Sequence, residues 1–488
     1  MPADYLREFE VSIESFRGLR KCFAVASQSR YPETMAKEST PEFKAEELAP
    51  EWRRAVVYVE EHVGGRVVHA ERQARWRPAW FFDVETSDGI VPIYFRGARG
   101  EAGLGVYTLD HEGAVLEVLA ENGVPVPKVW GVCSDPPGLV LDRSPGRANL
   151  ATAESEEERR TVFREYMEWL AKMHEIDLAD FEARGLTRPP DEATRALGDL
   201  ASWEKAYRGN KVRPEPMIEF VLAWLKRHMP QGRDETTFLC GDAGQFIFED
   251  GHMTAVLDLE LAYLGDPAAD LGALFGRTLS EPLGDLLAGI RHYESCRGIE
   301  VDPRVVQYHA VRFGICTPLA VSHLCAEPPP GLVYAQYLGW YVVYGRASLE
   351  WIAGLMGIDL EAPADPVAEA SAYAPAFSSI RAALQPKPED STFAAFEKDC
   401  IDRSAIYLQR ADQYGAAVAQ ANQEEAMALL NSAEPVSDEQ LEALVAREDP
   451  ANDEALIRFF HRRLLREEFL LSPAMRELEN IEIPRLIG

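Results

Sequence analysis

Two aspartates have the spacing that a phosphoryl-transfer site needs. Asp242 follows a strand-like apolar run and a glycine, so it would sit rigidly at a loop tip, ready to orient a hydroxyl group. Asp258 ends a second apolar run, and residues 246–257 between them predict a β-hairpin that turns at Asp250-Gly251. Because a hairpin brings its two ends together, both carboxylates would open on the same side of one small sheet. There Asp258 could hold Mg²⁺ on a nucleoside triphosphate while Asp242 handles the acceptor.

Residues 238–272 resemble the catalytic core of the aminoglycoside phosphotransferase and choline kinase family, small-molecule relatives of the protein kinases. The family's His-Gly-Asp motif corresponds here to Cys240-Gly241-Asp242, and its later metal-binding aspartate corresponds to Asp258. The resemblance implies that Asp242 is the catalytic residue and Asp258 a metal ligand. A second metal ligand is Gln245 if the loop is two residues shorter than in the family, whereas Ile247 takes that position if it is not.

The same resemblance extends to the Gly265-Asp266-Pro267 segment and to Asp270-Leu271. In the family these motifs brace the helix behind the catalytic loop. We interpret Asp266 as a helix cap and Asp270 as a buried brace, so both would support the structure.

Upstream residues supply what the amino-terminal lobe of such an enzyme needs. Residues 80–96 predict a two-stranded hairpin that ends at Arg96, and residues 109–122 predict a helix. The resemblance places Arg96 on the nucleotide phosphates, with a glutamate of the next helix as its partner. Glu112 is the predicted partner. Glu117 lies about 140° around the helix from it, so only one of the two can face Arg96.

The resemblance also implies a hinge that holds the adenine, with backbone groups near Leu141 and Arg143 as nucleotide contacts. The loop that covers the phosphates is expected at residues 73–80, which contain no glycine. Gly64 and Gly65 are the alternative if this loop lies earlier in the chain.

The predicted fold class is α+β: a two-lobed protein-kinase-like fold with a small antiparallel amino-terminal sheet plus helix, a mostly helical carboxy-terminal lobe and an extra carboxy-terminal helical segment. The expected divisions are an amino-terminal helix and linker, the two lobes, a second linker and the helical extension, at residues 1–50, 51–142, 143–360, 361–392 and 393–488. In the extension, Ser437-x-x-Gln440 has the pattern of a capping box. The extension could serve as an interaction element, as a cover over the site or as added helices packed on the lobe, and a homodimer through these helices is left open.

Composition restricts the partners of the protein. A formal net charge of −30 over 488 residues argues against nucleic acid and anionic membranes. The seven cysteines show no metal-ligand spacing, which is typical of reduced thiols in a cytoplasmic protein. The acidic amino-terminal residues are not expected to form a signal peptide, and no apolar run predicts a membrane span.

The expected function is that of an ATP- and Mg²⁺-dependent kinase for a hydroxyl group of a small molecule. Residues 305–355 are rich in aromatic residues and poor in carboxylates, which favours an apolar or aromatic acceptor over a polycation. A sterol, a hydroxy fatty acid, a hydroxyacyl-CoA or a phenol would fit. One alternative is a pseudokinase that has lost catalysis and acts as a binding or scaffold module. Another is a site that uses a different nucleotide or transfers a different group.

Overall fold

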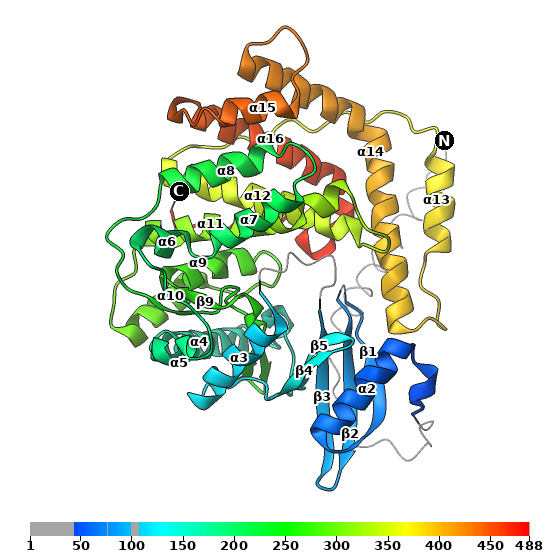
Figure 1. Ribbon diagram of the computed structural model, residues 1–488. Coiled ribbons are helices and arrows are strands. Elements are labelled where there is room, and N and C mark those ends of the chain that lie inside the picture. Colours follow the sequence, from blue (N-terminus) through cyan, green and yellow to red (C-terminus); the bar gives the residue numbers. More distant parts are fainter. Residues whose placement is uncertain (1–42, 76, 99–106, 488) are drawn as a thin grey trace.

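The computed structural model describes residues 43–75, 77–98 and 107–487. The predicted helix at the amino terminus lies outside these residues. The described chain forms a five-stranded sheet at one end and a larger helical mass at the other (Figure 1). This arrangement confirms the predicted two-lobed α+β fold class.

The amino-terminal lobe is an antiparallel sheet with the strand order β1-β2-β3-β5-β4. Its core consists of buried aromatic and branched residues, among them Phe82 and Phe95. Helix α2 contacts β1, β2 and β4, and α3 contacts β4 and β5. The elements of this lobe are α2 (Pro50–Val63), β1 (Arg66–Arg72), β2 (Ala79–Thr86), β3 (Gly89–Gly97), α3 (Leu109–Glu121), β4 (Val129–Ser134) and β5 (Pro137–Asp142).

The helical lobe is built around long helices that share one apolar core with the short strands of the catalytic segment. Its helices are α4 (Glu156–Met173), α5 (Leu178–Glu182), α6 (Glu192–Leu197), α7 (Leu200–Asn210), α8 (Pro216–Arg227), α9 (Ala268–Arg277), α10 (Leu286–Arg297), α11 (Pro303–Ala326) and α12 (Tyr334–Met356). Two small antiparallel pairs lie among them, β6 (Thr237–Leu239) with β9 (Tyr263–Gly265) and β7 (Phe246–Glu249) with β8 (His252–Val256). Short 3₁₀ turns are η3 (Ala45–Glu47), η5 (Leu150–Thr152), η6 (Leu259–Leu261), η7 (Pro450–Asn452), η8 (Ser472–Ala474) and η9 (Arg476–Leu478).

The carboxy-terminal extension consists of α13 (Ala374–Ala383), α14 (Thr392–Leu430), α15 (Asp438–Val445) and α16 (Asp453–Leu471). The stretch expected to be a linker therefore contains a helix, α13, although none of its residues is buried. The capping box predicted at Ser437 and Gln440 is present at the start of α15.

Helix α14 runs from the helical mass down to the sheet (Figure 1). Near its start, the Phe393 ring lies 4.3 Å from the guanidinium carbon of Arg72 on β1. Further along, Ile406 packs with Ala335 of α12 and Ala474, and Tyr407 donates a hydrogen bond to Glu467 of α16 at 2.8 Å. One helix thus contacts both lobes.

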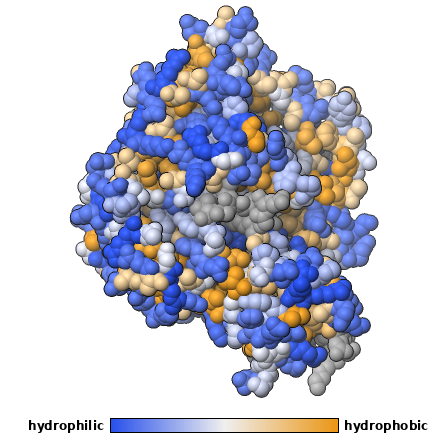
Figure 2. Space-filling model, in the orientation of Figure 1, coloured by the Kyte–Doolittle hydropathy of each residue, from blue (hydrophilic) through white to orange (hydrophobic). Residues whose placement is uncertain are grey.

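The face shown in Figure 2 is largely hydrophilic, with apolar residues in small groups. Among the described residues, no helix is both long and apolar enough to cross a membrane.

Candidate active site

The predicted hairpin is formed by β7 and β8, which pair with Phe246 opposite Val256. Asp250 and Gly251 both have positive φ, at 50° and 79°, as the two central residues of a tight hairpin turn require. At the open end, the Leu257 amide donates to the Gln245 carbonyl at 3.0 Å. This bond joins the end of the catalytic loop to the residue before Asp258. The sequence expectation that the hairpin brings the two carboxylate-bearing segments together therefore holds in the structure.

Asp242 is held by two side chains at this loop tip. Gln245 donates through its amide nitrogen to Oδ2 at 2.8 Å. Arg277, the last residue of α9, donates through Nε at 3.1 Å and Nη2 at 2.8 Å, one bond to each carboxylate oxygen. Burial raises the pKa of Asp242 to about 6, with the charge of Asp258 adding to the rise, although Arg277 acts in the opposite direction. A carboxyl group near neutrality at a loop tip is suited to proton handling.

Sequence analysis did not identify Arg277. It lies seven residues after Asp270 on the same helix, which is about two turns. That spacing places Arg277 on the same helix face as Asp270, which braces the catalytic loop. The spacing is therefore the sequence signal that could have revealed Arg277. Arg277 also pairs with Glu281, at 3.6 Å from Nη1.

Asp270 braces the catalytic loop from behind. Its carboxylate accepts from the backbone amides of Cys240 at 2.8 Å and Gly241 at 3.0 Å, and it contacts Nε2 of His174 at 3.2 Å. Gly241 has φ +78°, and a Cβ there would lie 2.0 Å from the Leu261 carbonyl oxygen. The loop can therefore reach this position only with glycine.

Asp266 lies just before α9 and accepts from the Ala268 amide at 2.9 Å. It also forms a two-pronged ion pair with Arg233, at 2.7 and 2.8 Å. Although burial opposes ionisation, hydrogen bonds from Arg233, together with the His309 imidazole 3.7 Å away, hold the pKa of Asp266 well below its usual value. The structure thus ties the Asp266 carboxylate to the first turn of α9, although the N-cap position itself is Pro267, and it places Asp270 as a brace behind the loop.

Arg96 lies on β3, paired with Ala79 and Leu139 of the neighbouring strands. It is buried and forms ion pairs with Glu112 of α3 and with Asp258. Glu117, the other glutamate of that helix, pairs instead with Arg184 at the surface.

Two further charged residues in this cluster were not assigned a role from the sequence. Glu260 lies 3.1 Å from Nη2 of Arg96, and Arg77 donates to both oxygens of Glu260, at 3.0 and 3.1 Å. Burial raises the pKa of Glu112 to about 7 against the pull of Arg96, because Asp258 and Glu260 add negative charge nearby. The cluster is thus a dense, mostly acidic group around two arginines, where phosphates could compete for the cations.

The predicted covering loop, residues 73–80, connects β1 to β2. Gly64 ends α2 and Gly65 follows it, at the opposite end of β1, so neither belongs to this loop. Arg75 donates to the Tyr94 hydroxyl at 2.8 Å.

The hinge residues are tied to the sheet. Leu141 is buried in β5, opposite Tyr94 of β3. The Arg143 amide donates to the Pro92 carbonyl at 3.0 Å, and its guanidinium donates to Asp83 at 2.8 Å. Adenine binding by Leu141 and Arg143 stays a prediction.

Among the described residues, no group of three or more histidine, cysteine, aspartate or glutamate side chains could hold a metal ion by itself. The candidate ligands are the Asp258 carboxylate and the Gln245 amide oxygen, since the amide nitrogen of Gln245 is used by Asp242. Mg²⁺ is usually bound by one or two protein oxygens together with substrate phosphates, and this donor set fits that pattern. Ile247 lies within β7, one residue beyond its start.

Among the aromatic residues of the segment 305–355, which is expected to shape the acceptor pocket, Tyr344 is close enough to Arg277 and Asp242 for their charges to act on it. Its hydroxyl contacts Ser280 Oγ at 3.0 Å. Burial raises the pKa of Tyr344, while the charge of Arg277 opposes the rise and that of Asp242 adds to it. Tyr308 instead donates to the Leu225 carbonyl in the core at 3.0 Å. The segment 305–355 also contains Phe313, His323, Tyr334, Tyr337, Trp340 and Tyr341, which the sequence likewise offers for an acceptor pocket.

Residues 105–305, which include Glu112 and the whole catalytic segment, match the model of the phosphotransferase enzyme family. This part of the chain is similar to that family. The match to the phosphotransferase family ends before most of α11, and it covers neither Arg96 nor the carboxy-terminal extension.

Curated relatives have longer chains. Acyl-CoA dehydrogenase family member 10 of Mus musculus is 29% identical over 178 residues, and the match covers 34% of this chain and 16% of the relative. Acyl-CoA dehydrogenase family member 11 of Gallus gallus is 28% identical over 275 residues, covering 50% of this chain and 33% of the relative. This chain thus spans no more than a third of either relative.

Among solved structures, macrolide 2′-phosphotransferase of Brachybacterium faecium is similar with a TM-score of 0.42 and 20% identity, covering 57% of this chain and 94% of that one. An aminoglycoside phosphotransferase solved with AMP-PNP and hygromycin B has a TM-score of 0.44 and 15% identity, covering 61% of this chain and 99% of that one.

Proposed function

We propose that the protein transfers the γ-phosphoryl group of ATP to a hydroxyl group of a small molecule, in a reaction that requires Mg²⁺. The observation that carries this proposal is the convergence of Asp242 and Asp258 at one hairpin, beside the Arg96–Glu112 ion pair. These are the groups that phosphoryl transfer needs: one carboxylate for the acceptor, one for the metal, and one cation for the phosphates.

Asp242 would orient the acceptor hydroxyl and take up its proton. Its pKa of about 6 leaves it mostly ionised at neutral pH but close enough to neutrality to exchange a proton. Arg277 and Gln245 fix both oxygens of this carboxylate, which supports a defined orientation.

Arg96 would bind the nucleotide phosphates while Glu112 holds its guanidinium in place. Phosphates that reach Arg96 would compete with Asp258 for this cation and so free the Asp258 carboxylate. Asp258 and the Gln245 oxygen would then hold Mg²⁺, which supplies charge neutralisation on the phosphate oxygens.

The acceptor would be uncharged or anionic near its hydroxyl group, because Arg277 lies against Asp242 and would repel a polycation. The matched relatives carry the names of acyl-CoA dehydrogenase family members. A hydroxyacyl thioester is therefore the first acceptor to test, followed by sterols, hydroxy fatty acids and phenols.

The alternative is a binding module without catalysis, and one observation favours it. Arg277 forms a two-pronged ion pair with Asp242, so an acceptor hydroxyl must share or displace that interaction. A protein that binds a nucleotide without transferring its phosphoryl group would be consistent with this ion pair.

The deciding experiment compares stabilisation by ATP with and without Mg²⁺ in the wild type, in Asp258→Asn and in Asp250→Asn. Asparagine suits both positions because each has positive φ, and Asp250 lies at the hairpin turn away from the charged cluster. ATP at a hundredfold excess over its Kd should stabilise the wild type by about 2.7 kcal/mol. We expect this effect to need Mg²⁺, to disappear in Asp258→Asn and to persist in Asp250→Asn.

No stabilisation by any nucleotide would refute the phosphotransferase proposal. Stabilisation without transfer to any acceptor, measured with ATP labelled in its γ-phosphate, would instead favour the binding module.

A further inference from the structure

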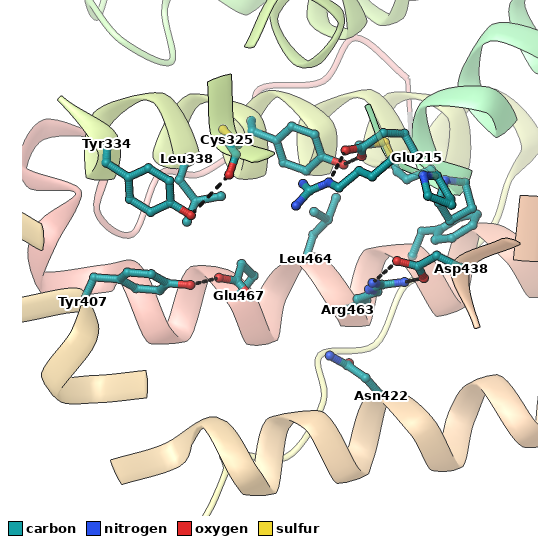
Figure 3. A pocket seen from close by; sticks show the side chains of 16 residues that line it. Glu215, Cys325, Tyr334, Leu338, Tyr407, Asn422, Asp438, Arg463, Leu464 and Glu467 are labelled. Atoms are coloured by element: carbon teal, nitrogen blue, oxygen red, sulfur yellow. Dashed lines mark hydrogen bonds and ion pairs between the residues drawn. The ribbon is translucent and has the colours of Figure 1, made fainter. Parts of the chain in front are cut away.

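A cavity of about 350 Å³ lies between the helical lobe and the carboxy-terminal extension. Its walls come from the segment before α8 and from α11, α12, α14, α15 and α16, and none of the phosphotransfer residues lines it. Figure 3 shows Tyr334 and Leu338 on the α12 side facing Tyr407 and Glu467 on the α14 and α16 side. Its volume is in the range of small-molecule sites in proteins.

Most charges in the cavity wall are already balanced. Arg213 donates through Nε to Glu215 at 2.7 Å, and the other oxygen of Glu215 accepts from the Tyr341 hydroxyl at 2.6 Å. Arg463 and Asp438 form a two-pronged pair at 2.6 and 3.0 Å. Each of these carboxylates therefore has an arginine of its own.

Glu467 is the exception. One of its oxygens accepts a hydrogen bond from the Tyr407 hydroxyl at 2.8 Å, and no arginine or lysine of the described chain forms an ion pair with it. Burial raises the pKa of Glu467 although Tyr407 and the charges of Arg463 and Arg213 oppose the rise. The cavity wall thus carries one carboxylate that forms no ion pair within the described part of the chain and accepts a hydrogen bond from a phenol. The charges of the wall sum to a single negative charge, which a singly charged cation would balance.

The surfaces around Glu467 suit an organic cation. The tyrosine rings of residues 334, 341 and 407 line the same cavity and offer π-faces, which attract ammonium groups. Leu338, Leu464 and Phe460 add apolar surface for the body of a ligand. An inorganic cation would use none of this apolar and aromatic wall.

We propose that this cavity binds a small organic ammonium ion, with Glu467 as its counter-ion and the tyrosine and leucine side chains around its apolar body. The site is separate from the phosphotransfer site, but both contact α12: Tyr341 reaches Glu215 in the cavity, whereas Tyr344, one turn later, contacts Ser280 beside Arg277.

The test measures binding of isoamylamine to the full chain by titration calorimetry in phosphate buffer, with isoamyl alcohol and isovalerate as neutral and anionic probes of the same shape. The wild type should bind the amine and neither of the other probes. Glu467→Gln keeps an oxygen that can accept from Tyr407 but removes the charge. It should weaken amine binding by about ten- to a hundredfold, the effect of losing one charge-assisted hydrogen bond.

Glu454→Gln is the matched control, because it makes the same change on the same helix outside the cavity, where Glu454 pairs with Arg458. It should bind the amine as the wild type does. Leu338→Trp is a second variant that fills the cavity and leaves Glu467 in place, and it should also lose binding. The proposal is overturned if the wild type binds none of the amine, if the alcohol binds equally well, or if Glu467→Gln binds like Glu454→Gln.

Discussion

Replacement of Asp242 by asparagine should stabilise the protein. In the folded state the pKa of this carboxyl group is about 6, whereas its ordinary value is 3.8. A group whose pKa is raised by folding favours the folded state in its protonated form, so the fold loses stability as the pH rises between these two values. Each pH unit corresponds to about 1.36 kcal/mol. The difference of about two units gives a penalty of about 3 kcal/mol at about pH 8 and roughly 1.5 kcal/mol at about pH 5.

An asparagine at this position would resemble the protonated aspartic acid and carry no such penalty. We therefore expect Asp242→Asn to be more stable than the wild type by about 3 kcal/mol at about pH 8, with the advantage roughly halved at about pH 5. The measurement is chemical denaturation by urea over this pH range. It needs no substrate, so it tests the electrostatics of the site independently of its function.

The control is Asp250→Asn, the same substitution at the exposed hairpin turn, which should show no such dependence on pH. If Asp242→Asn were no more stable than the wild type, or if its advantage failed to grow with pH, the reasoning about burial at this site would be wrong. A gain in stability on removal of this carboxylate would be an example of the trade-off between stability and function that is common at functional sites.

Two further substitutions test other parts of the structure. Glu350 is bound by Arg346, His461 and Arg485. Although burial opposes ionisation, these partners lower the pKa of Glu350 from 4.5 to about 2. Glu350→Gln should therefore lower the free energy of unfolding by about 3 kcal/mol at neutral pH, and chemical denaturation should show this difference shrinking as the pH falls from about 4.5 toward 2. Gly241→Ala should lower the free energy of unfolding by more than about 2 kcal/mol, since it adds a clash with a backbone carbonyl to the strain of a positive φ. Gly251→Ala, at φ +79° with nothing within 4 Å, should lower it by about 1 kcal/mol from the strain alone. Equal losses for the two variants would contradict the clash.

The parts of the site that are close in sequence could be predicted. The turn residues Asp250 and Gly251 indicate the hairpin, and the hairpin then fixes where Asp258 lies relative to the catalytic loop. Helical periodicity separates Glu112 from Glu117, and the structure places them on different partners. Each of these inferences uses local geometry, which a short stretch of sequence determines.

The contacts that join distant segments could not be predicted in the same way. Arg277 reaches Asp242 because α9 packs behind the catalytic loop, and Arg77 reaches Glu260 across 183 positions of the chain. Helical periodicity can show that Arg277 and Asp270 share a helix face, but it does not specify which carboxylate an arginine comes to face, since that depends on how distant segments pack. The cavity beside Glu467 was missed for the same reason, because its walls come from six separate segments.

The contact between Phe393 and Arg72 has a mechanical consequence. Helix α14 is fixed at its middle to the helical lobe, so any change in the angle between the lobes must be taken up where its first turn meets β1. An interaction of this kind at a partly exposed site contributes about 0.5–1 kcal/mol, which is comparable to thermal energy. The extension is therefore attached to the helical lobe by packed side chains and reaches the sheet through a contact that thermal motion can break, so the Phe393–Arg72 contact would not by itself hold the two lobes at one fixed angle.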